Sequence, residues 1–262
     1  MELDRVFSSS GYATLDSPKQ PAILPGDMSM QSVILAGGLG TRLGSLTGDL
    51  PKPMVDIHGR PFLAYELDLL KLHRVNDIIL CVGHRAETIK DYFGDGSKFG
   101  VKIRYSLEPE TLMGTAGAVK QAEAFLNDVF FLVYADSYMP VDYAAAYQAL
   151  QCRPELGMMV VLRNENRYEQ SNLIVDKGLI KAYDKTRQLP GMDCINFGVS
   201  VLHKESLRLV PEGVPYSQEE WYQQLIRDGN LAAFETEKRF YEIGSPDGLA
   251  EFRRLVAEGA LP

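Results

Sequence analysis

The stretch VILAGGLGTRLGSLTGDLPKP, residues 33–53, joins an apolar segment to a glycine-rich loop and ends in a lysine between two prolines. VILA predicts a buried strand. The glycines lack side chains, so backbone N–H groups in the loop can approach an anion. Pro51 and Pro53 fix φ on both sides of Lys52, which is therefore presented from a stiff segment. The stretch predicts an anion site next to a fixed positive charge; a tight strand-to-helix turn is the alternative for the glycines alone.

This loop fits neither of the two common glycine-rich patterns. The dinucleotide fingerprint G-x-G-x-x-G, begun at Gly38, requires glycine where Leu43 stands. The pattern G-x-x-x-x-G-K-[ST] is not supplied from Gly37, Gly38 or Gly40. The sequence therefore argues against a hydride-transfer enzyme and against a P-loop kinase.

Composition narrows the class of protein. The 262 residues, 45% of them hydrophobic, can bury one substantial α/β core. A net charge of -8 argues against a partner that needs a broad basic surface, so we expect neither nucleic acid nor a membrane as partner. Three cysteines without CxxC spacing indicate reduced thiols in a cytoplasmic protein. No apolar run approaches the ~20 residues that span a bilayer.

From residue 31 the pattern alternates strands with helices. Expected strands are 32–36, 77–83, 102–108 and 129–136, and expected helices are 62–75, 86–94 and 114–126. This alternation predicts right-handed crossovers and a parallel sheet between two helix layers. Residues 1–30, rich in Ser, Gly and Pro, predict a flexible leader.

The second half of the chain is less regular. Strands are expected over 156–163 and 196–203, and a hairpin is expected to turn at Lys177 and Gly178. Ser217 followed by Glu220 predicts a capped helix start. A closing helix is expected over 245–259, where Gly259 is a stop signal.

The segment LAGGLGTRLGSLTGDLPKPMVDIHGRPFLAY resembles the N-terminal signature of the sugar-phosphate nucleotidyltransferases, GGxGTRLxPLT followed by PKP and xGKPxLxY. It departs from that signature at Gly44 and Ser45. ETLMGTAGAV, FFLVYADSY, IKAYDKT, NFGVSVL and YEIGSPDGLAEF are similar to later segments of the family.

The resemblance implies an α/β fold, a Rossmann-like three-layer α/β/α sandwich with a mixed, mainly parallel central sheet. Residues 31–262 would form a single catalytic domain, with a nucleotide-binding half about 31–140 and a sugar-binding half about 141–262. The short segment after EIGSP resembles compact family members and leaves no room for the extra domain of longer relatives.

The family's reaction is attack of a sugar 1-phosphate oxygen on the α-phosphorus of a nucleoside triphosphate, which releases pyrophosphate. Two anionic reactants meet, so catalysis depends on positioning and charge stabilisation. The resemblance implies catalytic roles for Arg42 on the departing pyrophosphate, Lys52 on the α-phosphate and Lys185 on the sugar phosphate. The implied nucleotide-binding residues are Leu35, Ala36, Gly37, Gly38, Gly40, Thr41, Gly114 and Thr115.

Asp136 follows an apolar strand, so it should lie at the carboxyl end of the sheet, where α/β folds bind ligands. We expect it to bind Mg²⁺, which prefers one or two carboxylates together with phosphate oxygens. Glu242 occupies the family's second metal position, usually Asp. The implied sugar-binding residues are Glu108, Asn172, Asp184, Asn196 and Gly198. Ordinary structural roles are the alternative: a strand end for Asp136, a helix start for Gly114 and Thr115, and a solvated hairpin lysine for Lys185.

The expected substrates are an NTP and a sugar 1-phosphate, used to make a glycan precursor. Heptose- or hexose-1-phosphate guanylyltransferase is the favoured activity. Uridylyl, thymidylyl or cytidylyl transfer to another sugar or non-sugar phosphate is one alternative. A catalytically silent, regulatory nucleotide-sugar-binding protein is another, favoured by Ala135, Thr186 and Glu242. A homodimer is left open.

Overall fold

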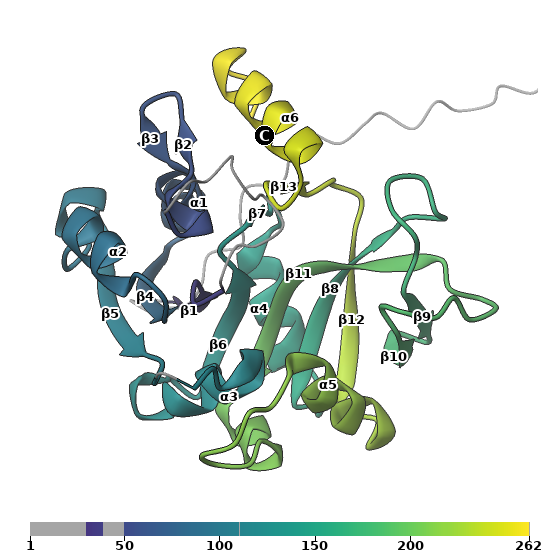
Figure 1. Cartoon of the computed structure of the whole chain (residues 1–262). Helices are drawn as coiled ribbons and strands as arrows, with labels where there is room; N and C mark the ends of the chain where they lie inside the picture. Colours follow the sequence, from purple (N-terminus) through teal and green to yellow (C-terminus); the bar gives the residue numbers. More distant parts are fainter. Residues whose placement is uncertain (1–29, 39–49, 110, 262) are drawn as a thin grey trace, which may run out of the picture.

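A computed structural model of the chain describes residues 30–38, 50–109 and 111–261. A nine-stranded sheet has the order β5-β4-β1-β6-β11-β8-β12-β10-β9 (Figure 1). Its strands are β1 Met30–Leu35, β4 Val75–Val82, β5 Lys102–Leu107, β6 Val129–Tyr134, β8 Gly157–Arg163, β9 Leu173–Asp176, β10 Leu179–Tyr183, β11 Cys194–His203 and β12 Leu231–Thr236. Two short pairs lie outside it: β2 Asp56–Ile57 with β3 Arg60–Pro61, and β7 Ser137–Tyr138 with β13 Tyr241–Glu242.

The sheet is mixed, as predicted. Strands β5, β4, β1 and β6 are parallel to one another, and β12 is parallel to β8. Strand β11 runs antiparallel to β6 on one side and to β8 on the other, and β10 is antiparallel to β12 and β9. The parallel part is the nucleotide-binding half of the prediction, and the antiparallel pairings follow it.

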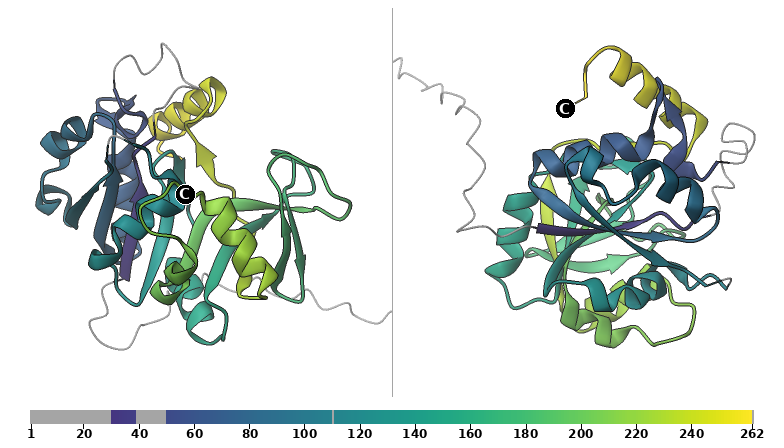
Figure 2. Two further views of the ribbon diagram at one scale, coloured as in Figure 1. Left: turned by 60° about the horizontal axis from the view of Figure 1, so that its bottom comes forward. Right: turned by 90° about the vertical axis from the view of Figure 1, so that its left-hand side faces the viewer.

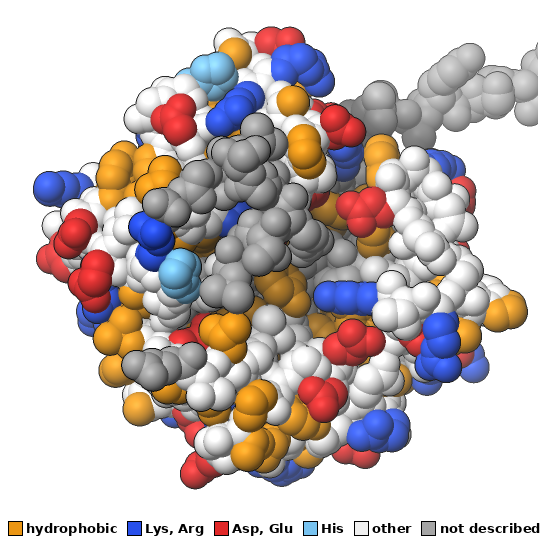
Figure 3. Space-filling model, in the orientation of Figure 1, with side chains coloured by type: hydrophobic (Ala, Val, Ile, Leu, Met, Phe, Trp, Pro, Cys, Tyr) orange, Lys and Arg blue, Asp and Glu red, His pale blue; other side chains and the backbone are white. Residues whose placement is uncertain are grey.

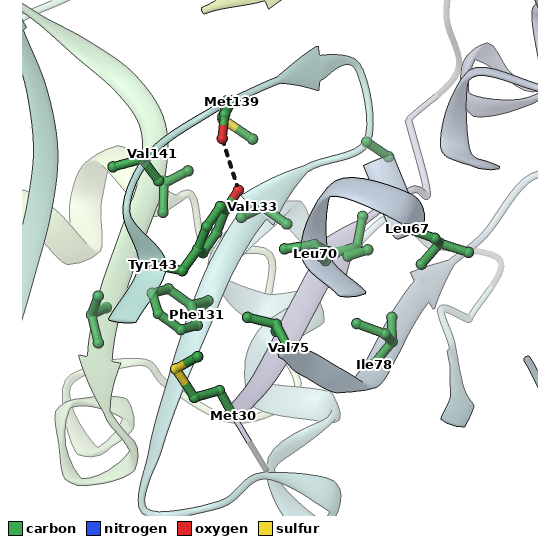
Figure 4. Close-up of a cluster of buried hydrophobic side chains, with 14 of the residues drawn as sticks. Met30, Leu67, Leu70, Val75, Ile78, Phe131, Val133, Met139, Val141 and Tyr143 are labelled. Carbon is green, nitrogen blue, oxygen red and sulfur yellow. Dashed lines mark hydrogen bonds between the residues drawn. The ribbon is translucent and has the colours of Figure 1, made fainter. Parts of the chain in front are cut away.

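Helices cover both faces of the sheet (Figure 2). They are α1 Phe62–Leu72, α2 Ala86–Phe93, α3 Gly114–Gln121, α4 Tyr143–Gln151, α5 Gln218–Arg227 and α6 Pro246–Ala257. Side chains alternate along β6: Phe131 and Val133 pack with α1, α2 and α4, whereas Phe130 and Leu132 pack with α3 and α5. Figure 4 shows the first of these faces, where the Tyr143 hydroxyl donates to the Met139 carbonyl at 3.1 Å. The three-layer sandwich is thereby confirmed.

Several local predictions are confirmed. Helix α5 begins with the expected capping box of Ser217 and Glu220. The hairpin β9–β10 turns at Lys177 and Gly178, which have φ of 50° and 74°. Helix α6 follows Ser245, whose side chain accepts from the Gly248 N–H.

Other boundaries differ from the prediction. Met30, assigned to the leader, is buried in β1; residues 1–29 lie outside the described residues. The helix expected over 114–126 ends at Gln121, and a separate 3-10 turn, Glu123–Phe125, follows. Helix α4 and strand β12 were not predicted. Among the described residues, no helix is long and apolar enough to cross a membrane.

Candidate active site

Two loops leave the sheet at one edge and meet there. Leu35 and Tyr134 are register partners at the ends of β1 and β6, and Ala135 N–H donates to the Leu35 carbonyl at 3.2 Å. The glycine loop and Asp136 therefore start side by side, because the carboxyl ends of parallel strands meet at the same edge.

Lys52 reaches this edge from a short 3-10 turn, Lys52–Met54, which follows Pro51. Its Nζ lies 3.0 Å from Asp136 Oδ2, and its side chain is only 11% exposed. Pro51 and Pro53 flank Lys52 in this turn, as in the stiff segment that the sequence predicts, and Asp136 compensates the ammonium charge where water access is limited.

Glu242 is brought to Asp136 by the β7–β13 pair. In this pair Glu242 is opposite Ser137, and the N–H of Ile243 donates to the Asp136 carbonyl at 2.9 Å. The Glu242 carboxylate accepts hydrogen bonds from the Gly244 and Ser245 N–H groups. Its longer side chain thus folds back onto the start of α6.

Both carboxylates and Lys52 converge on Gly244. A Cβ placed there would lie 2.8 Å from Glu242 Oε2, 3.5 Å from Lys52 Nζ and 3.8 Å from Asp136 Oδ2. The absent side chain leaves a small space bounded by two carboxylates and by the Lys52 ammonium. This donor set fits a magnesium ion that takes its remaining ligands from phosphate and water. No larger group of three or more His, Cys, Asp or Glu that could hold a metal occurs among the described residues.

Two cavities meet at Asp136. The first, of about 390 Å³, is lined by Leu35, Ala36, Gly37, Gly38, Lys52, Pro53, Glu108, Leu112, Gly114, Thr115, Ala118, Tyr134, Ala135 and Asp136. The second, of about 800 Å³, lies towards β10, β11 and α6. Tyr134 and Asp136 line both cavities. Asp136, the first of the two predicted metal ligands, therefore borders both of them.

Glu108 lies in the first cavity, not with the other predicted sugar-binding residues. A Cβ on Gly37 would overlap the Glu108 carboxylate, so a larger residue at this position would displace the end of that side chain. Burial raises the pKa of Glu108, and a hydrogen bond from the Met113 backbone opposes the rise. Glu108 follows β5, an outer strand of the parallel half, and lies apart from Asn172, Asp184, Asn196 and Gly198, which line the second cavity.

Gly114 and Thr115 also line the first cavity, and both have structural partners. Gly114 has φ of 69°, and a Cβ there would lie 2.7 Å from the Tyr216 carbonyl oxygen. The Thr115 hydroxyl accepts from the Gln218 N–H at 2.7 Å. Helix α3 is thereby fixed against the segment that begins α5, so close packing alone accounts for the glycine.

Gln218 extends this contact to Tyr134. The Tyr134 hydroxyl donates to Gln218 Oε1, and Gln218 Nε2 donates to the Tyr222 hydroxyl. Burial raises the pKa of Tyr134 well above its ordinary value, and the nearby Tyr222 and Tyr183 raise it further. The sequence analysis missed Gln218, because its position follows from the packing of α5 on β6 and no local pattern indicates it.

Asn172, Asn196 and Gly198 line the second cavity. Asn172 Oδ1 accepts from the Asn196 N–H at 3.0 Å, and Asn196 Oδ1 accepts from the Gly198 N–H at 2.8 Å. Gly198 has φ of 92°, and a Cβ there would lie 2.9 Å from Met139 Sδ. Phe197 and Phe240 add an aromatic wall, with ring centroids 5.5 Å apart. Amides and aromatic faces suit a polyhydroxylated ligand.

Asp184 and Lys185 stand at the end of β10 in the same cavity. Asp184 Oδ1 accepts from the N–H groups of Thr186 and Arg187, each at 2.9 Å. These backbone hydrogen bonds, with further ones from both side chains, hold the Asp184 pKa well below its usual range. Asp184 therefore shapes the turn around Lys185, and its carboxylate is largely occupied.

Two further acidic residues were missed. Glu169 lines the second cavity, where burial raises its pKa and the charge of Glu242 raises it further. Glu66, on α1, is 1% exposed and neither carboxyl oxygen has a hydrogen-bond partner. Burial, followed by the charge of Asp136, raises the pKa of Glu66 well above its ordinary value, which favours the neutral form of the side chain. An acidic residue on an apolar helix face was its only sequence signal.

Gly40, Thr41 and Arg42 lie outside the described residues. On the face drawn in Figure 3, the described Lys and Arg side chains are scattered among acidic ones. They form no broad basic patch on that face, in keeping with the net charge of -8.

The nucleotidyl transferase family profile matches residues 31–176. The chain belongs to the nucleotidyl transferase family. It is 32% identical to D-glycero-alpha-D-manno-heptose 1-phosphate guanylyltransferase of Campylobacter jejuni, over 85% of this chain and 98% of that protein. It is 29% identical to mannose-1-phosphate guanyltransferase of Saccharomyces cerevisiae, over 83% of this chain but 62% of that protein.

Solved structures agree. HddC from Yersinia pseudotuberculosis complexed with GMP-PN is 30% identical, with a TM-score of 0.71 over 87% of this chain and 99% of that one. The inositol-1-phosphate CTP transferase of T. maritima shares the fold, with a TM-score of 0.72 at 21% identity. The family resemblance predicted from the sequence is thus confirmed. The predicted enzyme class, the nucleotidyltransferases that include sugar-1-phosphate guanylyl- and uridylyltransferases, is confirmed as well.

Proposed function

We propose that the protein transfers a guanylyl group from GTP to a heptose or hexose 1-phosphate, giving a GDP-sugar and pyrophosphate for glycan synthesis. The observation that carries this proposal is the meeting of two cavities at Asp136, beside Lys52. The first cavity would hold the nucleotide, and the second the sugar phosphate. The Campylobacter and yeast relatives, both guanylyltransferases by name, support the choice of guanylyl transfer.

The chemistry needs charge stabilisation where the two phosphates approach. Lys52 would bind the α-phosphate of the nucleotide, and Lys185 would bind the phosphate of the sugar. Arg42 would stabilise the departing pyrophosphate beside the glycine loop. Each cation reduces the repulsion between reactants and favours the in-line approach of the sugar phosphate oxygen.

Enzymes of this family generally use a divalent metal, and we propose Mg²⁺. Asp136 and Glu242 would hold it in the space left by Gly244. Magnesium bound there would neutralise charge on the α-phosphate and help to orient it. Asp136 also holds Lys52, so a single carboxylate would set the relative positions of two cationic groups.

We further propose that residues 30–262, which begin with the buried Met30 of β1, form one catalytic domain with a nucleotide-binding half up to about residue 140, residues 1–29 being a leader. A cytoplasmic location, a homodimeric state and independence from membranes and nucleic acids remain predictions. Size-exclusion chromatography with light scattering measures the oligomeric state.

Pyrophosphate release tests the activity. The protein is incubated with Mg²⁺, each of the four NTPs and a panel of sugar 1-phosphates, and Lys52→Met serves as the inactive control. We expect the largest release with GTP and a heptose or mannose 1-phosphate. Release with UTP, dTTP or CTP instead would assign another nucleotide. Tight binding of nucleotide sugars without release would support the silent regulatory alternative and refute the enzyme.

A further inference from the structure

The Lys185 ammonium lies over two aromatic rings in the second cavity. Its Nζ is 5.9 Å from the ring centroid of Tyr134 and 5.7 Å from that of Tyr183. Both distances lie within the ~6 Å over which a ring face attracts a cation. Among the described residues, Lys185 takes part in no ion pair, whereas Lys52 is bound to Asp136.

The nearest acid in sequence does not neutralise Lys185. Asp184 Oδ1 accepts from Thr186 and Arg187, and Asp184 Oδ2 accepts from Arg187 Nε at 2.7 Å. The Asp184 carboxylate is thus directed to the following turn. Among the described residues, the recorded neighbours of the Lys185 ammonium are therefore two rings and no carboxylate.

Helix α5 is hydrogen-bonded to the Tyr134 side chain and to the Tyr183 backbone. From this helix, Gln218 accepts from the Tyr134 hydroxyl, and Gln223 donates its Nε2 hydrogen to the Tyr183 carbonyl. On the other side, Asn196 Nδ2 donates to the Tyr183 hydroxyl at 3.2 Å. Both tyrosines are therefore fixed by hydrogen bonds to their polar groups, which leaves their faces to the cation.

We propose that Tyr134 and Tyr183 are positioning residues that place the Lys185 ammonium for the phosphate of the incoming sugar. This inference rests on the proposed function of the second cavity. A carboxylate partner would cancel the charge of the lysine, and the incoming phosphate would have to displace it. An aromatic face restricts the ammonium to one place and leaves its charge available to a phosphate.

The test compares ring removal with ring retention at Tyr183, which lines the second cavity but not the first. Using the sugar phosphate that the wild type turns over best, we expect Tyr183→Leu to raise the acceptor KM about tenfold. The nucleotide KM should stay within about twofold, and Tyr183→Phe should keep the acceptor KM within about threefold. An equal rise in both KM values for Tyr183→Leu would overturn the proposal.

Tyr147→Leu is the matched control. It removes another buried tyrosine ring, from α4 on the opposite face of the sheet and away from both cavities. Its acceptor KM should equal that of the wild type. If the acceptor KM of Tyr147→Leu rises as much as that of Tyr183→Leu, general loosening of the core explains the effect, and the positioning role of Tyr183 is refuted.

A double-mutant cycle decides whether the ring acts through the lysine. In a Lys185→Met background, Tyr183→Leu should raise the acceptor KM no further. If the two effects multiply in full, the ring acts independently and the proposal fails. Should Tyr183→Leu not fold, Tyr134→Leu replaces it in the same cycle.

Calorimetric titration with mannose 1-phosphate repeats the comparison as a binding constant. It separates failure of the proposed positioning role of the two tyrosines from failure of the proposed function. If the wild type binds this acceptor without turnover, only the proposed function is contradicted. The binding constants of the same variants still test the positioning role of the two tyrosines. A wild type with neither binding nor turnover overturns both.

Discussion

Lys52 Nζ and Asp136 Oδ2 lie 3.0 Å apart at the boundary of the two cavities, so the lysine is held in place before any substrate binds. Lys52→Met should lower kcat by about 10²–10³, the usual effect of removing one preorganised charge-stabilising group. Pyrophosphate release measures it, and Lys90→Met, which removes an ion-paired lysine on α2, is the control. Turnover near the wild-type value would exclude Lys52 from the mechanism.

Asp136 and Glu242 are expected to set the dependence on metal. Asp136→Asn should raise the Mg²⁺ concentration for half-maximal activity at least about tenfold, because a ligand matters at least as much as the groups that orient one. Chelation should abolish wild-type activity, and added Mg²⁺ should restore it. Glu235→Gln, an exposed acid paired with Arg163, is the control. Full activity in excess chelator would contradict the metal site.

A substitution at Gly114 measures how much the close packing at the N-terminus of α3 contributes to stability. Gly114→Ala should lower the free energy of unfolding by about 2–4 kcal/mol, from a strained φ and contact with Tyr216. Gly229→Ala is a close control, because Gly229 has φ of 67° and nothing within 4 Å of the added Cβ. It should cost only about 1–2 kcal/mol. Equal losses in urea denaturation would mean that the Tyr216 contact relaxes freely.

Glu66 should make stability depend on pH. An unfolded glutamate ionises near pH 4.3, about its ordinary pKa, whereas burial beside Asp136 and Tyr143 keeps folded Glu66 protonated well above that pH. The folded state thus binds more protons, so the contribution of Glu66 to stability falls as pH rises from about 4.3 towards its folded pKa.

Glu66→Met removes this titration and the two unpartnered oxygens. We expect it to raise the free energy of unfolding by about 1–3 kcal/mol at pH 8, with a smaller gain at pH 5. Thermal denaturation across this range measures the effect. Glu87→Met, on the exposed side of α2, should leave the pH profile unchanged. A gain that is the same at both pH values would mean that Glu66 is not a buried neutral acid.

Much of the fold could be predicted where the signal is local. The apolar run of β1, the Ser217 capping box and the turn at Lys177 and Gly178 each specify their structure within a few residues. Helix α4 was missed although Asp142 caps it, because its Tyr- and Ala-rich residues show weak amphipathic contrast. Strand β12 was missed as well, and its place between β8 and β10 depends on tertiary packing.

The candidate site shows the same division. The inward direction of Lys52 follows from its two prolines, and the place of Asp136 follows from the strand before it. The separation of Glu108 from the other predicted sugar-binding residues could not be foreseen, because the order of strands in a sheet cannot be read from spacing. The contacts of Gln218 with Thr115 and Tyr134 join segments far apart in the chain, and no local pattern announces them.

The β7–β13 ladder has a consequence for the order in which a ribosome makes this protein. Asp136 emerges early, with the parallel strands, but its partner Glu242 and the inserted strand β12 come near the end of the described chain. A nascent chain that has not reached residue 242 already carries the glycine loop and Lys52, yet lacks the second carboxylate. The pair of carboxylates is therefore completed only after residue 242 has been synthesised.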